Sequence, residues 1–368
     1  MKIETSTPRQ DGFHIPAEFE LHEGCWMLWP DKGETFRAGG VYAQKVFRDV
    51  AKVISRYEKV TVCVNHRQYN NALFYFQYEE NIRVIEMSSD DAWMRDVGPT
   101  FVVDSQNRIR GIDWAFNAYG GLTDGLYFPW EKDNMVARKV CSILDVPMYS
   151  LPHFVMEGGS FLTDGEGTLV VAKECLLSEG RNPNLSESEI EQILHEYLGV
   201  EKILWLERGM ILDETNGHVD NLLCFNHPGE VLLSWTDDKA NPQYDIVRSC
   251  LETLESETDA KGRRLLIRKM PLPPDVRMTE EEAAGLQYEP LCFRRKAGDC
   301  FAASYVNIYI ANGCVVYPTF NAPQDEIARN ILAEAFPRRD IIGIPARELF
   351  LGGGGIHGIT LQQPKEFA

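Results

Sequence analysis

The sequence predicts a mixed α/β protein built from repeated units. Short runs rich in β-branched and aromatic residues alternate with amphipathic helical stretches along all 368 residues. Polar clusters recur beside these runs, near glycine, at intervals of 56 to 81 residues. Their centres are Asp96, Glu157, His218, Asp299 and Gly355. This rhythm indicates five similar units that place polar tips around a shared axis, in a ring-like architecture.

Six runs carry the strand prediction because each is short, apolar and rich in valine, isoleucine or threonine. They are residues 60–64, 82–85, 100–103, 168–171, 231–233 and 306–310.

Three helices are predicted between the strands. Residues 43–57 are amphipathic, with one apolar face. Residues 186–189 form a capping box that opens a helix through Leu198, which Gly199 ends. A third helix runs from Asp325 to Phe336 and stops before Pro337.

A run of four glycines, residues 352–355, lies near the C-terminus. Glycine is favoured where the main chain must turn sharply or approach a ligand closely. Ile356, Ile359 and Thr360 follow and predict a strand. Such a loop and strand would present position 358 to a pocket, and that position is glycine. No linker divides the chain, so one domain spanning residues 1–368 is expected.

Composition excludes several classes of protein. The net charge of −18 opposes binding to nucleic acid. Neither a long apolar segment nor a signal peptide is visible, so we expect a cytoplasmic protein that does not interact with membranes. The nine cysteines include no CxxC pair and therefore indicate neither a disulfide framework nor a zinc knuckle.

The first two clusters combine carboxylates with glycine. Residues 90–100 contain three aspartates, Trp93 and Arg95, and end in a predicted strand. An aspartate there could hold a guanidinium through two charge-assisted hydrogen bonds. The alternative is a turn in which Arg95 pairs with a neighbouring aspartate. Glu157 precedes two glycines and is either an acid at a tight backbone site or part of an exposed turn.

The third cluster places His218 two residues before Asp220. On a strand both side chains would face one way. Such a pair suits proton transfer beside a cation, a metal site, or a purely structural hydrogen bond.

Taken together, these motifs resemble agmatine deiminases of the guanidine-modifying (pentein) superfamily over nearly the whole chain. The matching segments are residues 26–30, 91–96, 113–121, 157–160, 215–220 and 352–364. The resemblance implies a five-bladed α/β propeller of five pseudo-repeats around a central pocket. It implies hydrolysis of agmatine to N-carbamoylputrescine and ammonia in polyamine (putrescine) metabolism. The reaction would pass through a cysteine amidino-thioether, with no cofactor or metal, in a homodimer.

The resemblance assigns roles by position. Asp96 and Asp220 resemble the pair that grips the guanidinium nitrogens. His218 resembles the general acid/base, and Glu157 its orienting partner.

Two further residues resemble contacts to the rest of the substrate. Trp93 would pack on its methylene chain. Glu214 would meet its distal ammonium.

Gly358 departs from the family pattern, because the family has its nucleophilic cysteine there. Deleting one member of a catalytic unit costs roughly 10⁴–10⁶-fold in rate, so the recorded sequence is expected to be inactive. Two alternatives remain. One is a non-catalytic protein that binds or senses a guanidino compound. The other is a metal-dependent hydrolase using His218, Asp220 and Glu157.

Overall fold

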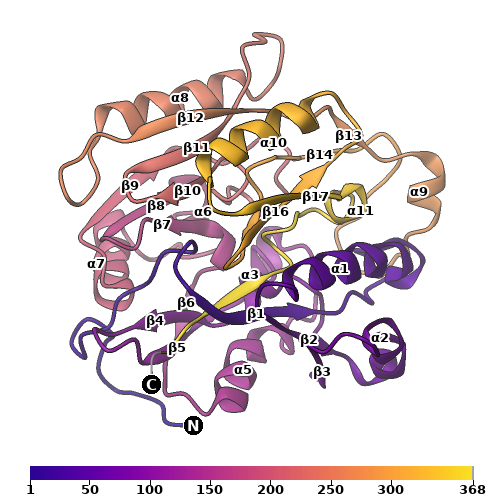
Figure 1. The fold of residues 1–368 in the computed structure, drawn as a ribbon, viewed down its shortest axis with the longest axis horizontal. Coiled ribbons are helices and arrows are strands. Elements are labelled where there is room, and N and C mark those ends of the chain that lie inside the picture. Colours follow the sequence, from indigo (N-terminus) through magenta and orange to yellow (C-terminus); the bar gives the residue numbers. More distant parts are fainter. Residues whose placement is uncertain (367–368) are drawn as a thin grey trace.

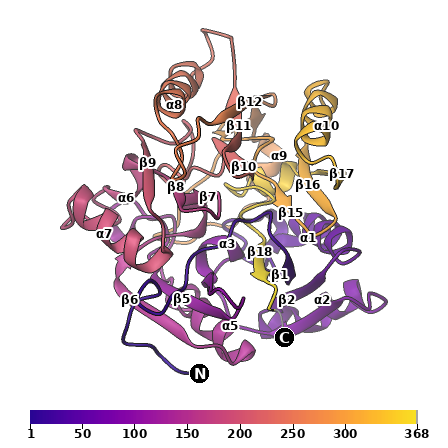
Figure 2. The same ribbon diagram turned by 60° about the vertical axis from the view of Figure 1, so that its left-hand side comes forward.

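The computed structural model describes residues 1–366 and confirms the mixed α/β class (Figure 1). The longer helices lie at the periphery and the strands lie further in (Figures 1 and 2). The helices are α1 (Val41–Ile54), α2 (Tyr69–Phe76), α3 (Met94–Val97), α4 (Gly121–Asp124), α5 (Val136–Leu144), α6 (Lys173–Leu176), α7 (Glu187–Leu198), α8 (Tyr244–Ser256), α9 (Glu280–Ala284), α10 (Gln324–Ala335) and α11 (Arg347–Phe350).

One strand pattern recurs in four sheets, in which the central strand pairs antiparallel with the preceding strand and parallel with the following one. The first two are β4 (Thr100–Val103), β5 (Ile109–Ala115), β6 (Met148–Val155), and β7 (Phe161–Thr163), β8 (Thr168–Ala172), β9 (Lys202–Leu206). The next two are β10 (Leu223–His227), β11 (Glu230–Trp235), β12 (Leu266–Pro271), and β15 (Tyr309–Ile310), β16 (Cys314–Thr319), β17 (Asp340–Pro345).

A fifth sheet follows the same pattern but joins the two ends of the chain. Its order is β18 (Leu361–Pro364), β1 (His22–Leu28), β2 (Lys59–Val64) and β3 (Ile82–Glu86), with β18 antiparallel to β1. Strands β13 (Val276–Arg277) and β14 (Cys300–Phe301) form a small separate antiparallel pair. The predicted repetition is therefore present in the strand topology. The propeller arrangement is consistent with it and stays a prediction.

All three predicted helices are present, as α1, α7 and α10. Ser186 and Glu189 form the predicted capping box of α7, and Gly199 ends the helix in the left-handed conformation. Five of the six predicted strands are present, but residues 306–308 lie outside β15.

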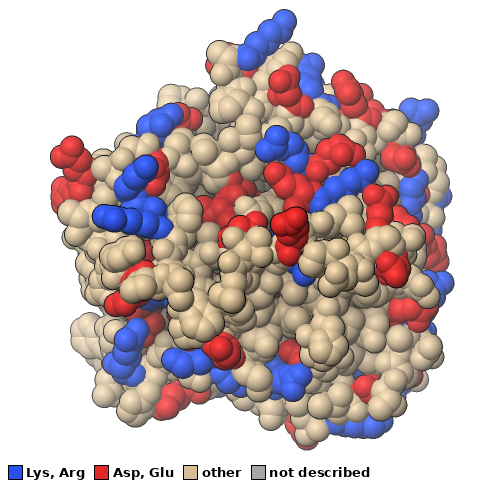
Figure 3. All heavy atoms as spheres, turned by 180° about the vertical axis from the view of Figure 1, so that it is seen from behind, with Lys and Arg blue, Asp and Glu red and all other residues tan. Residues whose placement is uncertain are grey.

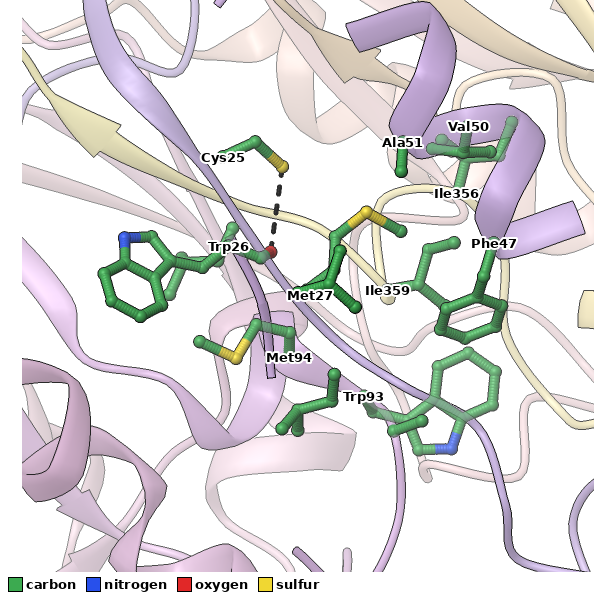
Figure 4. Close-up of a cluster of buried hydrophobic side chains, with 14 of the residues drawn as sticks. Cys25, Trp26, Met27, Phe47, Val50, Ala51, Trp93, Met94, Ile356 and Ile359 are labelled. Atoms are coloured by element: carbon green, nitrogen blue, oxygen red, sulfur yellow. Dashed lines mark hydrogen bonds between the residues drawn. The ribbon is translucent and has the colours of Figure 1, made fainter. Parts of the chain in front are cut away.

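The predicted strand at residues 356–360 is wrong, because residues 356–359 form a turn and β18 begins only at Leu361. Ile356 and Ile359 are both fully buried and pack in one core cluster with Phe47 and Val50 of α1 (Figure 4). Two apolar side chains three residues apart can reach one core from a turn, whereas alternation along a strand would send them to opposite faces. The turn holds Gly358 in place, and its carbonyl accepts a hydrogen bond from the Arg95 amide at 3.0 Å.

No helix within residues 1–366 is both long and apolar enough to cross a membrane. Basic and acidic side chains are interspersed on the face seen in Figure 3, where several acidic ones gather near the middle.

Candidate functional site

Six of the seven predicted site residues line one pocket with an empty volume of about 380 Å³. They are Trp93, Asp96, Glu214, His218, Asp220 and Gly358. The seventh, Glu157, is completely buried directly behind His218. Turns, loops and the short helix α3 supply these residues, which lie far apart in sequence.

Gly159 marks the point where the charged side chains converge. A Cβ atom on this residue would lie 2.5 Å from His218 Nδ1 and 3.0 Å from a carboxylate oxygen of both Asp96 and Asp220. Its amide donates a hydrogen bond of 2.9 Å to Asp96 Oδ1. Only glycine leaves room for three charged groups to meet here.

His218 and Asp220 are brought together by a loop and not by the predicted strand. Both precede β10, in a segment that contains turns and bends. Their side chains nevertheless reach the same pocket. The prediction that both side chains face one way is met in the pocket, but the predicted strand is wrong.

His218 faces carboxylates at both ring nitrogens. Nδ1 lies 4.0 Å from Asp96 Oδ1, and Nε2 lies 3.6 Å from Glu157 Oε2. The second distance exceeds a hydrogen bond, and such contacts in ligand-free sites often tighten when substrate binds. Glu157 is held from its other side by Arg181, whose Nε donates to Oε1 at 2.8 Å.

These charges decide the protonation state of His218. Burial alone lowers the pKa of the imidazole, but Asp96, Glu157 and Asp213 outweigh it and raise the pKa to about 9. His218 is therefore an imidazolium at neutral pH and can donate a proton. Burial raises the pKa of the Glu157 carboxyl, yet Arg181 and His218 hold it below its ordinary value, so Glu157 stays ionised.

Asp96 lies in α3, and opposing influences set its pKa. Burial, with the nearby Asp220 and Glu157 carboxylates, raises its pKa to about 6 although His218 opposes the shift. The Tyr119 hydroxyl donates a hydrogen bond of 2.9 Å to Asp96 Oδ2, and its ring packs against His218 at a centroid distance of 5.7 Å.

Asp220 is held by a second histidine. His357 Nδ1 lies 2.9 Å from Asp220 Oδ2, and His357 Nε2 lies 2.9 Å from Glu18 Oε1. Burial and Arg95 lower the pKa of His357, but the Glu18 and Asp220 carboxylates outweigh them and raise it. His357 does not line the pocket, yet it contacts Asp220, which does.

Trp93 covers the pocket beside the glycine segment. A Cβ on Gly354 would lie 2.5 Å from the indole, and one on Gly358 would lie 3.2 Å from it. The other side of the indole contacts Phe36, with ring centroids 5.5 Å apart. Trp93 is therefore fixed between core and pocket.

Glu214 lines the pocket but already has a cationic partner. Arg295 Nε donates to Glu214 Oε1 at 3.0 Å, and both side chains are nearly buried. A second arginine nitrogen donates to the Gly352 carbonyl at 3.0 Å, which ties Glu214 to the glycine segment.

Asp299 does not reach the pocket and is only half-buried, so its place in the predicted series is wrong. The residue from that part of the chain that lines the pocket is Asn307. Its side-chain oxygen accepts a 2.9 Å hydrogen bond from the His357 amide. Polar clusters at regular sequence intervals could not identify Asn307, because the loop between β14 and β15 is irregular.

The predicted metal triad of His218, Asp220 and Glu157 does not converge as a triad. Among the described residues the donor atoms that gather within 4.8 Å belong to Glu157, Cys175 and His218. Arg181 pairs with Glu157 there and opposes the binding of a cation.

No cysteine among residues 1–366 lines the pocket. Cys175 is the thiol beside Glu157 and His218, and burial raises its pKa far above its ordinary value. Cys224 is also buried, and burial raises its pKa as well.

Sequence reasoning missed Tyr119, Arg181, Glu18, Arg295 and His357. Two signals were available. Tyr119 lies inside a matched motif, and His357 adjoins the nucleophile position. The partners Glu18, Arg181 and Arg295 lie outside every polar cluster, so only the fold could reveal them.

The family model of Porphyromonas-type peptidyl-arginine deiminases matches residues 14–364. An agmatine deiminase from Pseudomonas aeruginosa (strain LESB58) is 50% identical over 364 residues, covering 99% of each chain. The structure of the Enterococcus faecalis agmatine deiminase superposes with a TM-score of 0.96 at 44% identity and covers 100% of both chains. A substrate-bound C. jejuni agmatine deiminase variant superposes with a TM-score of 0.81 at 25% identity, covering 97% of each chain. The chain is therefore a member of the agmatine deiminase family.

Proposed function

We propose that this chain binds agmatine and is organised to hydrolyse it to N-carbamoylputrescine and ammonia. The observation that carries the proposal is the convergence of Asp96, His218 and Asp220 around Gly159, in the pocket that Gly358 lines. A buried guanidinium requires anions, and two carboxylates from separate segments supply them. Relatives that carry the name agmatine deiminase support a guanidino substrate of this class.

Each residue then has a distinct role. Asp96 and Asp220 accept hydrogen bonds from the guanidinium nitrogens, and Trp93 packs on the methylene chain. His218, protonated at neutral pH, donates its proton to the departing ammonia. Glu157 orients and charges the imidazole, and Arg181 holds Glu157 in position.

The role of Glu214 follows from its partner. Arg295 offsets the charge of Glu214, so the pair attracts the distal ammonium less than a free carboxylate would. Glu214 accepts the ammonium through its oxygens while Arg295 fixes its orientation. The cytoplasmic location and the homodimer remain predictions.

Turnover is the step that Gly358 impairs. The guanidinium carbon would face a glycine where the family pattern has a thiol, so covalent attack from position 358 is impossible. We expect tight binding and a turnover roughly 10⁴–10⁶-fold below that of the thiol-bearing form.

The test combines binding and turnover. Calorimetry should show agmatine binding by the chain as it stands, and binding should be lost in Asp96→Asn and Asp220→Asn. Asp237→Asn, which changes an exposed carboxylate, is the matched control. Gly358→Cys should raise ammonia release strongly and form an amidino adduct visible by mass spectrometry.

Four outcomes would change the proposal. Absence of agmatine binding would overturn it. Ordinary turnover without substitution would overturn the claim of inactivity, and binding with a silent Gly358→Cys variant would favour a binding or sensing protein. Loss of ammonia release on chelation would favour a metal-dependent hydrolase.

A further inference from the structure

Tyr119 has a backbone conformation that residues with side chains rarely adopt. Its φ angle is 70°, and the preceding Ala118 has a φ angle of 55°, so two consecutive residues occupy the left-handed region. Both residues are buried, and Tyr119 lines the pocket. Such conformations cost free energy and persist only where the surrounding structure holds them. The fold therefore maintains this turn against the local preference of its residues.

Hydrogen bonds from two other segments hold the turn. The Leu126 amide donates to the Ala118 carbonyl at 2.8 Å. Arg181 donates from Nη1 to the Tyr119 carbonyl, and from Nε to Glu157 Oε1 at 2.8 Å. One buried guanidinium thus fixes both the strained turn and the carboxylate that lies behind the acid/base.

The turn directs the Tyr119 hydroxyl at Asp96. The hydroxyl donates to Asp96 Oδ2 at 2.9 Å, and the Gly159 amide donates to Oδ1 at 2.9 Å. Each carboxylate oxygen therefore has one fixed donor and keeps a second lone pair for a ligand. Burial and the Asp96 carboxylate raise the pKa of Tyr119 well above its ordinary value, so the hydroxyl stays a donor at neutral pH.

Asp96 differs from two other carboxylates of the pocket in the kind of group that holds it. Glu214 pairs with Arg295, and Asp220 pairs with His357. A cationic partner offsets the negative charge that a guanidinium ligand needs. A hydroxyl and an amide instead orient a carboxylate and leave its charge intact.

We infer that Tyr119 is a positioning residue for guanidinium binding, because it orients Asp96 in the ionised form without neutralising it. Arg181 supports this role by holding the strained turn in place. The inference rests on the proposed function, and it adds a residue that acts on the substrate through Asp96.

The charges around Asp96 make this role measurable. His218, Asp220 and Glu157 are the charged groups that face it, and the hydroxyl donor further stabilises its ionised form. Tyr119→Phe removes that donor and keeps the ring. The pKa of Asp96, which burial already raises to about 6, should then rise further. Agmatine affinity should therefore begin to fall at a higher pH.

The experiment measures agmatine affinity by calorimetry between pH 5.5 and 8.5, for the full chain and for Tyr119→Phe. Because a hydrogen bond to a charged group is lost, affinity should fall about tenfold near pH 6.5. It should fall only about threefold at pH 8.5, where Asp96 is ionised in both chains. Site-specific 3-fluorotyrosine at position 119 supplies a stronger donor and should move the profile the opposite way, to lower pH. The fluorinated chain decides the question if Tyr119→Phe does not fold.

Tyr309→Phe is the matched control. Tyr309 is buried, and its hydroxyl donates to the buried Glu58 carboxylate at 2.6 Å, away from the pocket. This variant should keep both the affinity and its pH profile.

Three results would overturn the inference and leave the proposed function standing. They are an equal loss in Tyr119→Phe at every pH, a profile that neither change at position 119 shifts, and a matching loss in Tyr309→Phe. Absence of agmatine binding by the unsubstituted chain would instead defeat the proposed function.

Discussion

His357 Nδ1 lies 2.9 Å from Asp220 Oδ2, and both side chains are buried. The other ring nitrogen contacts Glu18, so the imidazole bridges two carboxylates. Although burial raises the pKa of Glu18, Arg95 and His357 outweigh burial and hold it near 2. A row of Glu18, His357 and Asp220 thus leads from a partly exposed carboxylate to the pocket.

Glu18→Gln should weaken agmatine binding about tenfold, since a charge-assisted hydrogen bond contributes about 1.5–3 kcal/mol and part of it positions Asp220. The loss should grow as pH rises, because His357 then loses its proton more readily. Calorimetry across pH checks this. Glu23→Gln, in an exposed pair with Lys59, is the control and should have little effect. Unchanged affinity at every pH would assign the row a purely structural role.

Agmatine affinity should fall as pH falls through about 6, because Asp96 becomes protonated there and ceases to attract a cation. The sign follows from its raised pKa, since the carboxylate is ionised above that value and neutral below it. Binding isotherms between pH 5 and 8 test this, and Asp237→Asn, at an exposed carboxylate, should keep the same dependence. A flat profile in the unsubstituted chain would contradict the assignment of Asp96.

Glu157→Gln should lower the pKa of His218 toward its ordinary value of 6.5. Glu157 stabilises the imidazolium, so its neutral amide removes part of that stabilisation. An NMR titration that follows the His218 ring signals against pH reports this pKa directly. Glu187→Gln, an exposed change at the start of α7, should leave the titration unaltered. A pKa that stays near 9 would show that other carboxylates suffice.

Gly159→Ala should abolish agmatine binding and destabilise the protein by about 1–3 kcal/mol, because its methyl group would overlap His218 and crowd both aspartates. Gly358→Ala adds the same methyl group in the same pocket, where its nearest neighbour is Trp93 Cε3 at 3.2 Å, so a shift of a few tenths of an ångström suffices and its urea midpoint should fall much less. Comparison of the two unfolding curves separates local crowding from general sensitivity. Equal midpoints would refute the packing argument.

Much of the fold was readable from local pattern. The capping box at Ser186 and the apolar face of residues 43–57 are properties of neighbouring residues, and both elements formed as predicted. The strand at residues 356–360 failed for a physical reason. Ile356 and Ile359 favour a strand individually, yet both are drawn into the core beneath α1, which only a turn permits.

The residue types of the site can be read from local motifs. Asp96, Glu157, His218 and Asp220 stand in recognisable motifs, and Gly358 is conspicuous through its neighbours. How these groups are charged and held depends on the folded chain. Burial raises the pKa of Asp96, surrounding carboxylates make His218 an imidazolium, and Glu18 and Arg181 arrive from distant segments. Protonation depends on distance and desolvation, and neither is defined until the chain has folded.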